Sequence, residues 1–271
     1  MSVQVVDGFS LTNRWLLYAS LMLAPAQFVS GIGSNCPSNI GFLAYNWYTQ
    51  IQWYQAVRAQ ELHALSLLPV HFNLIYAITY LGGITSGNLF MAVVLGVGTA
   101  GVIVLNTVSA WVSWATNMPE GYDAYQFFFF GWRTLTPGWH KFVLVWQVGD
   151  SMFALASVLM AIITAIRFVY IDEEDDSSRL VPWRKGTGPR SNLALWRYPA
   201  IPLGAAAVML GAWPLVLWTE LIVQRNKIES ETDMVAVWLF VAQAAALVAP
   251  SCGDVWRVFS CGWRRRRDEQ A

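Results

Sequence analysis

The stretch "MAVVLGVGTAGVIVL", residues 91–105, places glycines at positions 96, 98 and 101 in the spacing G-x-G-x-x-G. In a dinucleotide-binding fold this motif follows a β-strand and opens a helix. Here the glycines lie inside an apolar segment, Asn88–Trp114, which is long enough to cross a hydrocarbon core of about 30 Å. We therefore interpret the stretch as a transmembrane helix whose glycines let a neighbouring helix approach closely.

The composition of the whole chain agrees with a membrane protein. Of 271 residues, 56% are hydrophobic and 13% are charged, about half the charged fraction that is usual in soluble domains. Mean hydropathy is +0.42. The sequence contains no basic domain with interleaved aromatic residues, which would indicate nucleic-acid binding. The three cysteines form no C-x-x-C motif, so the sequence predicts neither a disulfide scaffold nor a zinc site, and we expect no metal or cofactor.

Six apolar segments are long enough, or nearly so, to span a bilayer as helices, because an isolated span must satisfy its own backbone hydrogen bonds. They are Trp15–Gly33, Leu65–Ile84, Asn88–Trp114, Lys141–Tyr170, Tyr198–Val223 and Met234–Pro250. The predicted fold is an all-α polytopic membrane protein, a bundle of about six transmembrane helices. It forms one domain over residues 1–250, followed by a basic tail over residues 251–271.

Basic residues in the loops give the expected orientation. Five lie in the loop 171–197, and four form the run Arg264–Arg267 in the tail. The positive-inside rule places both segments in the cytoplasm, and six spans then place the amino terminus there too. We expect the endoplasmic reticulum or the plasma membrane. A cleaved signal peptide over residues 1–26, indicated by Ala24-Pro25-Ala26, is the alternative to an uncleaved first helix.

Two loops are rich in aromatic residues, and both are expected on the non-cytoplasmic side. Residues 34–64 contain "NWYTQIQWYQAVRAQELH" and predict an interfacial helix leading into the second span. Residues 117–140 contain "YQFFFFGWRTLTPGWH", whose rings suit the headgroup region. Small residues at 83 and 87, and at 207 and 211, repeat the spacing of a helix-packing seam.

Ionisable groups inside apolar spans are costly and are therefore the first candidates for function. Asp150 lies about 13 Å into the fourth span at 1.5 Å per residue. It is expected to be an acid, Glu220 a base or second acid, and His71 a positioning or proton-relay group, since burial tunes such groups for proton transfer. The expected substrate-binding side chains fall at similar depth: Asn73, Asn106, Gln147, Trp111, Trp146 and Trp218.

Each of these residues also has a structural explanation. Glu220 is near a helix end, where its side chain can reach the interface. Asp150 and the asparagines can serve as hydrogen-bonding groups between helices, and His71 can pack with one hydrogen bond. The tryptophans suit a membrane-interface belt or a helix-packing core.

Three classes of function fit these features. The first is a membrane-embedded, cyclase-like biosynthetic enzyme that applies acid–base chemistry to a lipophilic small molecule such as an isoprenoid, with tryptophan faces stabilising a developing cation. The second is a small proton-coupled transporter or channel. The third is a non-catalytic scaffold. We prefer the enzyme, because the expected polar groups gather in one half of the membrane, whereas a transport path needs them in both. The expected partners are the lipid bilayer, a lipophilic substrate, and a packing helix or second copy of the chain.

Overall fold

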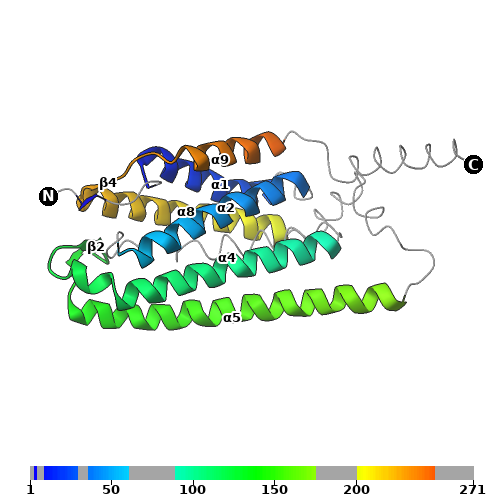
Figure 1. The fold of residues 1–271 in the computed structure, drawn as a ribbon, viewed down its shortest axis with the longest axis horizontal. Coiled ribbons are helices and arrows are strands. Elements are labelled where there is room, and N and C mark those ends of the chain that lie inside the picture. Colours follow the sequence, from blue (N-terminus) through cyan, green and yellow to red (C-terminus); the bar gives the residue numbers. More distant parts are fainter. Residues whose placement is uncertain (1–2, 5–8, 30–35, 61–88, 175–199, 248–271) are drawn as a thin grey trace, which may run out of the picture.

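The computed structural model describes residues 3–4, 9–29, 36–60, 89–174 and 200–247, and these residues are mostly helical. The six helices run side by side along the long axis of the molecule (Figure 1). They are α1 (Leu11–Val29), α2 (Cys36–Arg58), α4 (Leu89–Ala115), α5 (Pro137–Glu174), α8 (Ala200–Arg225) and α9 (Met234–Ala246). The helices pack in the order α5, α4, α2, α9, α1, α8, each against the next.

Three of these helices contain a segment that is long and apolar enough to cross a membrane: Val93–Ala115, Pro137–Ile166 and Leu203–Arg225. Helix α9 is apolar but shorter. Large apolar side chains on the outer faces of α5, α8 and α9 are exposed, among them Val145, Met152, Leu210, Leu217 and Trp238. Soluble proteins seldom expose apolar surface on this scale, so the outer faces are compatible with a membrane protein.

Helix α2 corrects the expectation that residues 34–64 form an interfacial helix. The helix packs lengthwise on α4 and α9, and its residues Phe42, Tyr45 and Val57 are buried. Residue numbers rise in the same direction along the contact between the two helices. Leu43 of α2 lies against Gly98 of α4, Trp47 lies against Gly101, and the Val57 carbonyl accepts a hydrogen bond from Asn117, just after α4. Helices α2 and α4 are therefore parallel members of one bundle.

The glycines of α4 do form the close contact that the sequence predicts. A Cβ atom at Gly98 would overlap the Leu43 side chain, and one at Gly101 would overlap the Trp47 ring. Trp47 Nε1 also donates to the Gly98 carbonyl at 3.0 Å. A second glycine, Gly41 of α2, lies against the backbone of Gln243 in α9, where a Cβ would sit 3.0 Å from the Gln243 Cα.

The seam expected at Ala207 and Gly211 is not formed within the described part of the chain. Ala207 is exposed, and a Cβ at Gly211 would meet no atom within 4 Å. These small residues therefore lie on the outer surface of α8. The other expected seam, Gly83 and Gly87, lies outside the described residues, as do the span 65–84 and the basic tail.

We call one end of the molecule the hairpin end. There α2, α4 and α8 finish, α1, α5 and α9 begin, and the strands β2 (Gln126–Phe128) and β3 (Trp132–Thr134) form an antiparallel hairpin. The 3-10 helix η3 (Met118–Gly121) precedes this hairpin. Ten buried residues fill the core here: Phe9, Trp53, Ala56, Val57, Met118, Tyr125, Leu135, Ile222, Val223 and Ile228.

The start of α1 lies at the hairpin end, and this corrects the expected chain path. Strand β1 (Val3–Gln4) pairs in parallel with β4 (Ile228–Glu229), and the Phe9 amide donates to Ser230 Oγ at 3.0 Å. The segment before α1 therefore lies beside the α8–α9 connection. With six spans, the segment before α1 and the α8–α9 connection were expected at opposite ends of the bundle. Because α2 is an additional helix of the bundle, the two segments can lie at the same end.

Candidate functional site

The inward face of α4 carries a row of polar side chains. Thr99, Asn106, Ser109 and Ser113 are spaced seven, three and four residues apart, which places them on one helix face. All four are at most 2% exposed. The Ser109 hydroxyl donates to the Leu105 carbonyl at 2.8 Å, whereas Asn106 Nδ2 makes no hydrogen bond within the described chain. An apolar helix thus turns its polar side chains into the bundle.

Helices α1, α2 and α9 add a second buried polar cluster. Ser20 Oγ donates to Gln243 Oε1 at 2.8 Å, and Asn46 Nδ2 lies 3.5 Å from Ser20 Oγ. These three side chains are fully buried. Asn39 and Gln50 of α2 are also buried, seven residues before and four residues after Asn46 on the same face. This cluster was not predicted from the sequence, because α2 was expected at the interface rather than inside the bundle.

The polar interior extends through both halves of the bundle. At 1.5 Å per residue, Ser113 lies about 3 Å from the end of α4 at the hairpin end, and Thr99 about 24 Å from it. Gln50 and Asn39 lie about 12 Å and 28 Å from the corresponding end of α2. The buried polar groups are therefore not confined to one half of the bundle.

Asp150 and Gln147 lie one turn apart on α5, which runs antiparallel to α4. Trp114 Nε1 donates to the His140 carbonyl at 3.0 Å, and this contact fixes the level of the two helices. Measured from this contact at 1.5 Å per residue, Asn106 lies about 12 Å along α4 and Asp150 about 15 Å along α5, so the two residues are at similar depth. Gln147 is fully buried, and neither of its amide atoms is hydrogen-bonded in the described chain. Asp150 is half-buried.

The three expected tryptophans are placed differently from one another. Trp111 Nε1 donates to Ser151 Oγ at 2.8 Å and so links α4 to α5. Trp218 Nε1 donates to the Phe128 carbonyl at 2.7 Å, which holds the hairpin against α8. Trp146 is 49% exposed on the outer face of α5 and does not line the interior.

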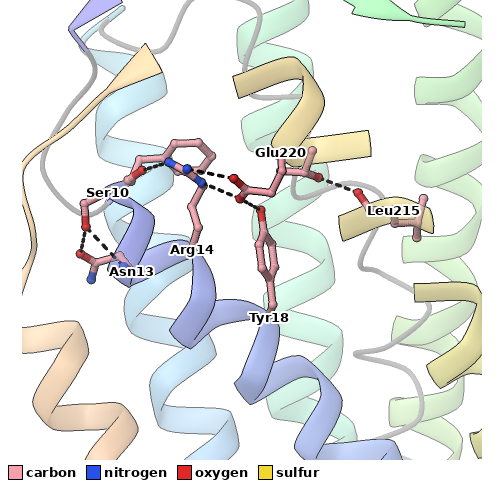
Figure 2. A network of polar contacts seen from close by, with 8 residues as sticks. Ser10, Asn13, Arg14, Tyr18, Leu215 and Glu220 are labelled. Carbon is pink, nitrogen blue, oxygen red and sulfur yellow. Dashed lines mark hydrogen bonds and ion pairs between the residues drawn. The ribbon is translucent and has the colours of Figure 1, made fainter. Parts of the chain in front are cut away.

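Glu220 is the acceptor of an ion pair that crosses from α8 to α1 (Figure 2). Arg14 Nε lies 2.8 Å from Oε1, and Arg14 Nη2 donates to Oε2 at 3.0 Å. The Tyr18 hydroxyl donates to Oε1 at 2.8 Å, and Arg14 Nη1 donates to the Phe9 carbonyl at 2.7 Å. The arginine is nearly buried, with an exposed side-chain fraction of 8% against 27% for the glutamate. Glu220 is therefore held by a bidentate pair rather than reaching freely to the interface.

A network of hydrogen bonds begins beside this ion pair, at the first residues of α1, and leads toward α9 and α2. Ser10 caps α1, since its Oγ accepts from the Asn13 amide at 3.3 Å while donating to Asn13 Oδ1 at 2.8 Å. Asn13 pairs with the backbone of Asp233: its Nδ2 donates to the Asp233 carbonyl at 3.0 Å, and its Oδ1 accepts from the Asp233 amide at 2.9 Å. The Tyr48 hydroxyl donates to Asp233 Oδ2 at 2.8 Å. The hairpin end thus links α8, α1, α9 and α2 by polar contacts.

His140 occupies a position that the sequence analysis did not select. Its Nε2 lies 2.7 Å from the Trp114 carbonyl, which can only accept, so Nε2 carries the proton. Its Nδ1 is hydrogen-bonded to the Tyr122 hydroxyl, and its ring lies 4.6 Å from that of Trp114. With the Trp114 indole bonded back to the His140 carbonyl, the two residues clamp α4 to α5.

Two of the expected site residues, His71 and Asn73, lie outside the described residues. Within the described ranges, no group of three or more His, Cys, Asp or Glu side chains could hold a metal ion. Comparison with known proteins returned no match to this chain among family models, curated proteins or solved structures.

Proposed function

We propose that this chain is a small proton-coupled transporter or channel, with the polar interior of the bundle as its path. The supporting observation is that buried polar side chains occur on all six described helices and, on α2 and α4, extend along most of the helix length. Their depth along α2 and α4 supports a path through both halves of a membrane. From the sequence we preferred the enzyme, because polar groups were expected in only one half of the membrane. Their distribution along α2 and α4 now leads us to prefer the transporter or channel.

The amides of the interior support a hydrated path or a bound polar solute. Buried polar atoms in native proteins are nearly always hydrogen-bonded to protein or to water. Within the described chain, Asn106 Nδ2, Asn46 Oδ1, Gln243 Nε2 and both amide atoms of Gln147 make no hydrogen bond. Water molecules or a small polar solute between the helices would satisfy them.

Asp150 is the proposed proton carrier. It is one turn from Gln147 and at the depth of Asn106, so a protonated carboxyl group there has polar neighbours along the path. Glu220 has a different proposed role, because both of its oxygens are already engaged by Arg14. It holds α8 to α1 at the hairpin end of the path.

For the membrane arrangement, we propose that α1, α2 and α9 cross together with α4, α5 and α8. The loop 171–197 and the tail would then face the cytoplasm, by their basic residues, and the hairpin end the opposite side. Helices α1 and α2, with 19 and 23 residues, are about 28 and 34 Å long, enough for a crossing. The endoplasmic reticulum and the plasma membrane are the proposed locations.

Proton flux into liposomes tests the proposal. The purified chain is reconstituted with a pH-sensitive dye inside, and a potassium gradient with valinomycin imposes an interior-negative potential. We expect faster acidification than in protein-free liposomes, and a loss of at least tenfold for Asp150→Asn. Asp123→Asn, the same chemical change in an exposed loop, is the matched control and should keep the wild-type rate. A wild-type rate equal to that of empty liposomes would overturn the proposal.

The membrane-embedded enzyme is the second candidate, favoured by one observation at Asp150. The residue before it, Gly149, is exposed, and a Cβ there would meet no atom within 4 Å. A lipophilic substrate could therefore approach the turn of α5 that carries Asp150 from the bilayer side. Gly149→Leu would obstruct this approach, so it should reduce product formation while leaving proton flux unchanged. An accumulated lipid-soluble precursor in cells that lack the chain, cleared on complementation, would favour the enzyme.

A further inference from the structure

The tip of the β2–β3 hairpin holds a phenylalanine away from the protein. Phe128 and Trp132 are paired across the two strands, and the Phe129 amide donates to the Gly131 carbonyl at 2.8 Å to close the turn. Phe130 and Gly131 both have positive φ, at 49° and 136°. The turn directs the Phe130 side chain outward, where it is 89% exposed. Exposing so large an apolar side chain in water is unfavourable.

The tip is fixed beside the first turns of α5. The Phe129 ring lies 5.4 Å from that of Trp139 and 5.5 Å from that of Phe142, and these last two rings lie 5.6 Å apart. Phe127 lies 5.2 Å from Trp139 on the same side. The aromatic cluster therefore positions the tip against the beginning of α5.

The exposed apolar surface of the tip is continuous with the outer face of α5. Phe142 is exposed, and Val145, Trp146 and Met152 continue the exposed apolar surface along the helix. That helix segment is long and apolar enough to cross a membrane. Whatever covers the outer face of α5 therefore also reaches the tip, and for a membrane-spanning helix it is lipid.

Basic side chains flank the aromatic tip. Arg133 on β3 and Lys141 on α5 are exposed, and the Arg225 guanidinium lies 5.2 Å from the centre of the Trp132 ring. Arg225 Nε also donates to Gln126 Oε1 at 2.6 Å, which fixes this arginine beside the hairpin. Aromatic rings with adjacent cations suit the boundary between acyl chains and phosphate headgroups.

We propose that the hairpin tip, residues 128–132, inserts into the headgroup–acyl boundary of the leaflet at the hairpin end. Phe129 and Phe130 enter the acyl region, and Arg133 and Lys141 lie at the level of the lipid phosphates. The tip anchors α5 at a fixed depth in the bilayer. This inference is independent of what passes through the bundle.

Fluorescence from a label at the tip tests the anchor. Cysteine is placed at position 130 in a chain with Cys36, Cys252 and Cys261 changed to alanine, and it is labelled with an environment-sensitive dye. The full chain is reconstituted in nanodiscs of phosphatidylcholine with phosphatidylglycerol. A label at position 123, in an exposed polar loop, is the matched control. Because Phe130 is exposed, its replacement should not disturb folding.

We expect the label at position 130 to emit at shorter wavelength than the control and to be quenched by lipids that carry a nitroxide near the headgroup. Aqueous iodide should quench it several-fold less than the label at position 123. Iodide quenching equal to that of the control would overturn the anchor, since the tip would then lie in water. Protection from both quenchers would also overturn it, because a protein surface rather than lipid would cover the tip.

Discussion

Arg14 Nε and Glu220 Oε1 lie 2.8 Å apart, although 206 residues separate them along the chain. The pair connects the first turn of α1 with the last turns of α8, and Tyr18 adds a third hydrogen bond to the same carboxylate. It joins helices from the two halves of the sequence. Its strength therefore bears on how firmly α1 is held in the bundle.

Removal of Arg14 should destabilise the fold more than removal of an exposed ion pair. Arg14→Gln leaves Glu220 with one hydroxyl donor, and we expect a loss of about 1–3 kcal/mol. This is less than the 3–5 kcal/mol for breaking a fully buried pair, because the glutamate is part-exposed. Thermal unfolding in detergent measures the effect. The exchanged pair, Arg14→Glu with Glu220→Arg, should recover part of the loss, and no recovery would argue against a direct pairwise interaction.

Substitutions at the α4 glycines should differ in severity. Gly101→Ala directs a methyl group into the rigid Trp47 ring, and we expect a cost of about 1–3 kcal/mol for the overpacked contact. Gly98→Ala meets the end of Leu43, which can change rotamer, so its cost should be smaller. Gly211→Ala, on an open face of α8, is the control and should be neutral or slightly stabilising. Equal effects at positions 101 and 211 would show that the Trp47 contact carries no strain.

Gln147→Leu should lower stability and activity together. The wild-type side chain is fully buried, and its amide makes no hydrogen bond in the described chain, so in the proposed path water satisfies it. A leucine leaves that water without its amide partner, and we expect a cost of about 1–3 kcal/mol. Melting temperature and proton flux measured on one preparation would test both effects. A variant that is more stable would indicate that the wild-type amide is buried without water and would count against a hydrated path at this position.

A disulfide between positions 10 and 232 should form without loss of fold. Ser10 Oγ and Thr232 Oγ1 lie 3.0 Å apart, with one residue at the start of α1 and the other just before α9. Cysteines at both positions, in a chain whose native cysteines are replaced, should cross-link under mild oxidation. A shift in gel mobility after protease cleavage between α5 and α8 reports the bond. Cross-linking that appears only in the unfolded chain would contradict the shared hairpin end.

Apolar periodicity was enough to predict α4, α5, α8 and α9, because a long apolar run has few alternatives to a helix. A helix was also predicted over the α2 segment, but it was expected at the interface, because its many Asn, Gln, Trp and Tyr residues are typical of an interface rather than of a bundle interior. Its buried polar residues could have been found from their spacing: Asn39, Asn46, Gln50 and Trp53 recur on one helix face.

The site was predicted less well than the fold. Gln147 and Asn106 were selected by depth, and both are fully buried, but depth alone cannot say which way a side chain faces, and Trp146, selected in the same way, is exposed. The partner of Glu220, Arg14, could not be inferred from the sequence. Pairing across 206 residues depends on the packing order of the helices, which local sequence patterns do not encode.

The long separation between Arg14 and Glu220 also has a consequence for synthesis. At about 5–20 residues per second, a ribosome needs roughly 10–40 s to add the 206 residues between them. During that interval the first helix has already emerged, with a guanidinium group whose carboxylate partner does not yet exist. A nascent chain stalled before residue 220 should therefore keep α1 loosely held and open to membrane quality-control factors. Once α8 has been synthesised, Glu220 can pair with Arg14 and hold α1 in the bundle.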